Sequence, residues 1–159
     1  MIKFQRLREN EWGAWEFDEY LDYIESVSHL MPEHLGQFAG SYSSYELTSS
    51  NTLHDSRMVT LSLSKEVGDD GVTSVARMDV VLLHQSHEKH VLLSYSGIIG
   101  YSAFETEILD RVRGVDVLLH EFSLLEGRGY RHAVLFENGG GYVVDFLHFE
   151  VKYRELQAG

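Results

Sequence analysis

The chain has 159 residues, of which 13 are Lys or Arg and 25 are Asp or Glu, so its formal net charge is −12. This length fits a single domain, and we expect residues 1–159 to fold as one unit. A strongly negative chain repels phosphate backbones and anionic lipid, which argues against nucleic acid and membrane surfaces as partners. Because the sequence contains no cysteine, a disulfide framework and a thiolate metal cluster are excluded.

The first residues alternate between apolar and polar and lack the apolar run of a secretory signal peptide. The longest aliphatic run covers only residues 80–83, whereas a membrane-spanning helix needs about 20 apolar residues. We therefore expect a cytoplasmic protein.

Apolar residues near the start of the chain recur at steps of three and four: Phe17, Tyr20, Leu21, Ile24, Val27 and Leu30. This spacing predicts an amphipathic helix that begins between residues 10 and 16. Met31 precedes a proline, which disfavours helical dihedrals, so the helix should end there. Pro32 suits the first position of a second short helix over 32–39, closed by Gly40. Residues 1–40 should be mainly helical.

After Gly40 the apolar period changes to two, so residues 41–159 should be mainly sheet. The expected strands are 42–47, 57–64, 74–84, 90–101, 115–125, 130–137 and 142–153. Their connections are short, as in hairpins, and too short for parallel crossovers. Segment 104–113 fits either a short helix or an irregular connection. The predicted fold is therefore α+β, with one or two N-terminal helices packed on one face of a six- to seven-stranded antiparallel meander sheet.

The last hairpin turns through Asn138 and three glycines. A three-residue loop over 139–141 predicts a register in which four residues of one strand pair with four of the next on a single face. The expected pairs are Phe136 with Val144, Val134 with Phe146, His132 with His148, and Tyr130 with Glu150.

Histidines suggest two places where a metal ion or acid/base chemistry would fit. His84, His87 and His90, together with Glu88, can offer ligands to a divalent ion, but Lys89 would repel a cation and the pattern favours a solvated polar loop. A second set lies on the C-terminal sheet: His120, His132, His148 and Glu150. Two imidazoles beside a carboxylate suit a metal site or an acid/base pair, whereas a buried structural contact is the alternative.

His54, Asp55 and Ser56 carry the residue types of a nucleophilic triad. Adjacent residues on an extended chain point to opposite faces, so these three cannot form a triad with one another. The motifs of nucleotide-binding enzymes, serine hydrolases and zinc proteases are absent from the sequence. No cofactor is therefore expected.

The negative charge is concentrated near the N-terminus. Residues 9–56 contain no Lys or Arg, while they carry ten acidic residues. The same segment holds Trp12, Trp15, Tyr20 and Tyr23. Acidic residues beside aromatic ones suit a protein interface, because charge accelerates encounter and aromatic rings supply buried anchors. The alternative is a solvated helix face whose aromatic side chains enter the core.

These patterns favour a small, non-catalytic binding protein that engages a basic protein partner. The residues expected to make that contact are Glu11, Trp12, Trp15, Glu16, Asp18, Glu19 and Asp22. A concrete instance is an immunity protein or inhibitor that occludes the basic cleft of a toxin or nuclease. The alternative is a metal-binding protein or hydrolase-type enzyme that uses the C-terminal histidines, and a homo-oligomer is a third reading.

Overall fold

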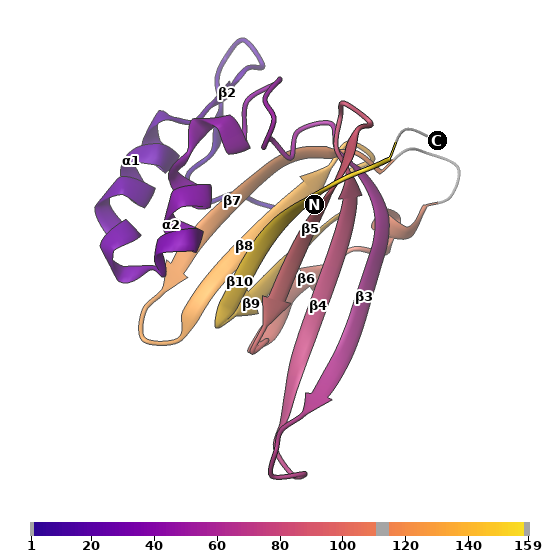
Figure 1. Cartoon of the computed structure of the whole chain (residues 1–159). Helices are drawn as coiled ribbons and strands as arrows, with labels where there is room; N and C mark the ends of the chain where they lie inside the picture. Colours follow the sequence, from indigo (N-terminus) through magenta and orange to yellow (C-terminus); the bar gives the residue numbers. More distant parts are fainter. Residues whose placement is uncertain (1, 111–114, 158–159) are drawn as a thin grey trace.

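The computed structural model describes residues 2–110 and 115–157, and within them two N-terminal α-helices stand beside two four-stranded antiparallel sheets (Figure 1). A two-stranded hairpin precedes the helices. The α+β class with N-terminal helices, expected from the sequence, is confirmed. Within the described residues, no helix has the length and apolar character needed to cross a membrane.

The helices end where the sequence predicts, but they begin later in the chain than predicted. Helix α1 (Asp18–Val27) continues as the 3₁₀ turn η1 (Ser28–Leu30), and Met31 then turns extended, with φ −105° and ψ 151°. Helix α2 (Glu33–Gly40) follows Pro32. The expected start of the first helix between residues 10 and 16 is wrong, because those residues instead form the turn and second strand of the hairpin.

The two larger sheets contain the remaining strands: β3 (Arg57–Val67), β4 (Ser74–Leu83), β5 (Lys89–Ser96), β6 (Gly100–Phe104), β7 (Val117–Leu125), β8 (Gly129–Phe136), β9 (Gly141–Phe146) and β10 (His148–Glu155). One sheet has the order β10-β5-β4-β3 and the other β6-β9-β8-β7. The strands thus divide between two sheets and do not form the single meander that we expected. The reason is that β10 pairs with β5 and not with β9, its neighbour in sequence.

Two of the expected strands, 90–101 and 142–153, are each broken where the chain passes from one sheet to the other. The breaks meet in space, since the amide of Leu147 donates to the carbonyls of Ser96 (3.2 Å) and Gly97 (3.1 Å). Gly97 has φ +61°, and a Cβ at this position would lie 2.9 Å from the Cβ of Leu147. The crossing therefore requires glycine, on grounds of both backbone conformation and space.

The core lies between the two sheets and extends under the helices. Its largest fully buried side chains include residues from both sheets and from both helices: Tyr20, Ile24, Leu35, Met78, Leu82, Leu93, Tyr95, Phe122, Phe136, Tyr142 and Phe146. Helix α1 contacts β7 and helix α2 contacts β10, the edge strands of the two sheets. The ring of Phe38 joins them, 6.0 Å from Phe122 and 5.9 Å from Phe149. The helices therefore pack where the two sheet edges come together, not on the face of one sheet.

Segment 42–47, expected as a strand, is the 3₁₀ turn η2 (Tyr42–Ser44) followed by irregular chain. Its side chains satisfy carbonyl groups at the end of α2. The Ser44 hydroxyl donates to the carbonyl of Phe38 (2.8 Å), and the Tyr45 hydroxyl donates to that of Ala39. Helix ends leave such carbonyls without helical partners, so this capping outweighs the strand preference of the segment.

The predicted register of the last hairpin is wrong. In the structure Tyr130 pairs with Phe146, His132 with Val144, and Val134 with Tyr142. Each partner differs from the expected one by four residues, because the turn is centred on Asn138 and not on Gly140, with the amide of Phe136 donating to the carbonyl of Gly140. An even shift preserves the face, so the residues expected on one side of β8 remain there. In segment 104–113, Thr106–Leu109 forms a 3₁₀ turn, and residues 111–113 lie outside the described part of the chain.

Candidate partner-binding surface

The N-terminal hairpin, β1 (Arg8–Glu9) with β2 (Trp15–Glu16), projects one aromatic side chain. The side-chain oxygen of Asn10 accepts the backbone amides of Trp12 (2.9 Å) and Ala14 (3.0 Å), which fixes the turn. Trp12 stands at its tip with 84% of its surface exposed. Trp15 is half-buried instead, with its ring 6.0 Å from that of Phe4.

A buried carboxylate holds the segment that leads into this hairpin. The backbone amides of Gln5, Arg6 and Leu7 donate to the carboxylate oxygens of Glu121, at 2.9, 2.8 and 2.9 Å. Glu121 belongs to β7 and is only 3% exposed. Three charge-assisted bonds of this kind fix the segment against the sheet. Nothing in the sequence pattern marked Glu121 for this role.

Helix α1 carries its acidic residues on the solvent side. Asp18, Glu19 and Asp22 are exposed, as are Glu11 and Glu16 before the helix. The seven residues expected to contact a partner thus all come from β2, the turn before it and α1, which lie next to each other in Figure 1.

In the folded chain two arginines also lie at this surface, although both precede the acidic segment in the sequence. The Arg6 guanidinium lies 3.3 Å from the ring centre of Tyr23, and Arg8 Nη2 lies 3.9 Å from Glu19 Oε1. These two arginines offset part of the acidic charge at one end of the surface. Among the described residues, Glu16, Asp18 and Asp22 form no ion pair, so the excess charge is concentrated there.

Two hollows flank Leu21 on this surface. The first, of about 520 Å³, is called the aromatic hollow and is lined by Trp15, Glu16, Phe17, Asp18, Leu21 and Tyr42. The second, of about 500 Å³, is called the interhelical hollow; its lining includes Leu21, Asp22 and Glu25 of α1 and Gly36, Gln37 and Gly40 of α2. The sequence analysis missed Phe17, Leu21 and Tyr42, because their periodicity indicated core or strand positions.

The C-terminal histidines do not converge on one site. His120 and His132 are fully buried and lie side by side, with His120 Nδ1 3.0 Å from His132 Nε2. His148 is exposed at the start of β10, and the exposed carboxylate of Glu150 lies 3.4 Å from Lys152 Nζ. In residues 2–110 and 115–157 no three His, Cys, Asp or Glu side chains are arranged to hold a metal ion.

The buried pair belongs to a chain of hydrogen bonds whose direction can be deduced. The carbonyl of Ser44 only accepts, so His120 Nε2–H donates to it (2.9 Å), and neutral His120 then accepts at Nδ1 from His132 Nε2–H. His132 Nδ1 in turn accepts from the hydroxyl of Tyr95 (2.6 Å). The Tyr95 oxygen is left to accept from Tyr142 (2.9 Å). All four ring nitrogens are thereby occupied.

The pKa values agree with this arrangement. Burial lowers the pKa of His120 to about 4, and it lowers the pKa of His132 well below its usual value, with the neighbouring His120 acting in the same direction. Burial likewise raises the pKa of Tyr95 and Tyr142. Both imidazoles are therefore neutral at neutral pH, and the network joins the two sheets to the segment after α2.

In the other histidine segment, residues 84–90, the ring nitrogens of His84 form local hydrogen bonds. His84 is buried, and its Nε2–H donates to the carbonyl of Ser49 (2.9 Å), which leaves Nδ1 to accept from the Ser86 amide (3.1 Å). His87 has φ +63° in the exposed turn. The contacts of His84 attach the turn between β4 and β5 to the segment after α2.

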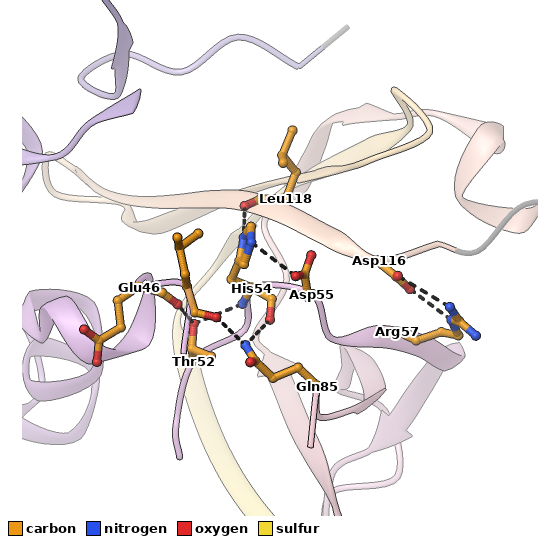
Figure 2. Close-up of polar contacts among 9 residues, drawn as sticks. Glu46, Thr52, His54, Asp55, Arg57, Gln85, Asp116 and Leu118 are labelled. Carbon is orange, nitrogen blue, oxygen red and sulfur yellow. Dashed lines mark hydrogen bonds and ion pairs between the residues drawn. The ribbon is translucent and has the colours of Figure 1, made fainter. Parts of the chain in front are cut away.

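Figure 2 shows His54 between two partners, with Nδ1–H donating to the carbonyl of Leu118 (3.0 Å) and Nε2 lying 3.4 Å from Asp55 Oδ2. The Gln85 amide donates to the carbonyl of His54 (2.9 Å). Ser56 is buried, and its hydroxyl has no hydrogen-bond partner among the described residues. The three residues do not form a triad, but the expected reason is wrong: His54 and Asp55 lie in a turn with Asp55 at φ +58°, so their side chains face each other, and it is Ser56 that hydrogen-bonds to neither.

Comparison with known proteins gives no relative: no protein-family model, curated protein or solved structure matches the chain. Any account of function therefore depends on the chemistry of this chain alone.

Proposed function

We propose that the protein is a non-catalytic binding protein that engages a basic protein through its acidic N-terminal surface, made of Glu11, Trp12, Trp15, Glu16, Asp18, Glu19 and Asp22. The most concrete form of the proposal is a cytoplasmic immunity protein or inhibitor that covers the basic cleft of a toxin or nuclease.

The observation that carries the proposal is an exposed indole, that of Trp12, on the same surface as three carboxylates that form no ion pair among the described residues, those of Glu16, Asp18 and Asp22. Trp12 is 84% exposed, and tryptophan is enriched among residues that dominate binding energy. The turn that presents it is held by two hydrogen bonds that the Asn10 side-chain oxygen accepts from backbone amides, so the ring is presented on a defined backbone. Because these three carboxylates form no ion pair within the described part of the chain, they favour a positively charged partner.

The proposal is tested by charge reversal with a matched control. The test variant carries Glu16→Lys, Asp18→Lys and Asp22→Lys, and the control carries Asp69→Lys, Glu88→Lys and Glu126→Lys. All six residues are exposed, and the control residues lie in turns between strands. Both variants change the net charge equally, so long-range attraction falls equally in the two.

Tagged wild type and both variants are used to capture basic proteins from the native lysate at low salt, with elution at high salt. We expect one defined partner to bind wild type and the control variant and to elute at high salt, because screening weakens charge-steered contacts. The test variant should not bind this partner. Retention of the same partner by the test variant, or equal loss in both variants, would refute the proposal.

A further inference from the structure

We propose that the surface recognises two basic side chains of one extended segment, an arginine in the aromatic hollow and a second basic side chain in the interhelical hollow. This inference rests on the proposed function and specifies the part of the partner that is recognised.

The aromatic hollow has the chemistry of an arginine site. Phe17 and Tyr42 are 5.8 Å apart in an edge-to-face arrangement, and Tyr42 is 51% exposed. Trp15 closes another side, and the carboxylates of Glu16 and Asp18 lie on the same lining. A guanidinium stacks on aromatic rings and pairs with carboxylates through its planar fork, whereas an ammonium is a more strongly hydrated point charge. Arginine is therefore preferred over lysine here.

The interhelical hollow is charged without being aromatic. Asp22 and Glu25 face it from α1, and the amide of Gln37 belongs to its α2 side. Gly36 also lines it: a Cβ there would lie 3.6 Å from the Ser28 Cβ, an ordinary contact, so nothing in the helix packing itself requires glycine. Carboxylates beside a polar lining suit either lysine or arginine.

An extended partner segment fits the spacing of the two hollows. Asp18 and Asp22 are four residues apart on α1, which separates them by about 6 Å along the helix axis. In an extended chain, side chains at i and i+2 point the same way about 6.6 Å apart. Leu21, which lines both hollows, lies between the two positions. An extended segment with basic residues at i and i+2 thus matches one residue to each hollow.

Synthetic peptides test this directly. The probe is a capped Arg-Ser-Arg peptide, compared with capped Arg-Ser-Ser and Lys-Ser-Lys at low salt. Trp12 and Trp15 are the chain's two tryptophans, and both lie on this surface, so indole fluorescence reports binding. We expect Arg-Ser-Arg to bind most tightly, with Lys-Ser-Lys weaker by about 3-fold or more through the lost stacking.

Two variants leave every carboxylate in place. Tyr42→Leu removes one aromatic face and keeps apolar bulk, while Gly36→Leu places a side chain in the interhelical hollow. Each should weaken Arg-Ser-Arg by about 3-fold or more, and Tyr42→Leu should also remove the preference over Lys-Ser-Lys. Tyr153→Leu, at another partly exposed tyrosine, is the control and should leave binding unchanged. Circular dichroism verifies that each variant is folded.

The outcomes separate this inference from the proposed function. If Arg-Ser-Arg binds wild type, Tyr42→Leu and Gly36→Leu equally, but not the variant reversed at Glu16, Asp18 and Asp22, the hollows are not sites and only the charged surface acts. If none of the peptides binds wild type, the two-site inference is overturned, whereas the proposed function is then decided by the capture of a basic partner.

Discussion

Acidification should destabilise the fold through the buried histidines. The unfolded chain binds a proton at each imidazole below about pH 6.5, whereas burial lowers the pKa of folded His120 to about 4. The unfolded state therefore holds more protons between these values, and the free energy of unfolding falls as the pH drops from 6.5 toward 4. From these two pKa values, His120 alone should remove about 2 kcal/mol between pH 7 and pH 5. His132 acts in the same direction.

The assay is urea denaturation of wild type and His120→Gln at pH 7 and pH 5. The variant should be less stable at pH 7, because the buried hydrogen-bond partners of His120 are then imperfectly paired. Its stability should nevertheless fall by about 2 kcal/mol less than that of wild type between the two pH values. His148→Gln, at an exposed histidine, is the control and should leave the wild-type decrease unchanged.

Nitrogen NMR of the wild-type imidazoles gives an independent measurement that does not depend on a stable variant. Both His120 and His132 should carry their proton on Nε2 at pH 7. The reasoning would be refuted if the His120 ring titrated near pH 6.5 in the folded protein, or if His120→Gln lost as much stability on acidification as wild type.

Three substitutions test other parts of the fold. Tyr95→Phe removes the donor to His132 Nδ1 inside the core, and chemical denaturation should show a loss of about 1–3 kcal/mol; no loss would contradict the deduced hydrogen-bond chain. Glu121→Gln should free the backbone amides of residues 5–7 for hydrogen exchange and lower the free energy of unfolding by about 2–4 kcal/mol; unchanged exchange would exclude the carboxylate clamp. Gly97→Ala should lower the melting temperature more than Gly127→Ala, since both glycines have positive φ but only Gly97 would also contact Leu147; equal effects would show that crowding at the crossing is unimportant.

The helical part of the fold could be predicted because its signals are local. The apolar spacing of α1, the extended residue before Pro32 and the short second helix each depend on neighbours in sequence. The start of α1 could not be predicted in the same way. The side chain of Asn10 forms a hairpin turn with Trp12 and Ala14, and the periodicity contains no sign of it.

The division into two sheets depends on contacts between distant residues. Alternation continues through both crossing points, so 90–101 and 142–153 each look like one strand. The break becomes necessary only when Gly97 and Leu147 meet, about fifty positions apart in sequence. The same limit applies to the histidines. Alternation placed His132 on one face with Val134 and Phe136 and left open whether that face is buried, because its partner Tyr95 comes from the opposite sheet.

The candidate surface was predictable in its charge and not in its shape. The acidic residues of α1 are exposed, as a solvated helix face predicts. Its hollows need Tyr42 from a segment expected to be a strand, and its local charge depends on Arg6 and Arg8, which return to α1 only in the folded chain. A count along the sequence therefore overstated the isolation of the acidic residues.

Capture from the native cell with wild type and the variant reversed at Glu16, Asp18 and Asp22 tests the central claim most directly. The account predicts one basic protein that binds wild type at low salt, leaves at high salt and is absent from the variant. Capture of that protein by wild type and variant alike would contradict it.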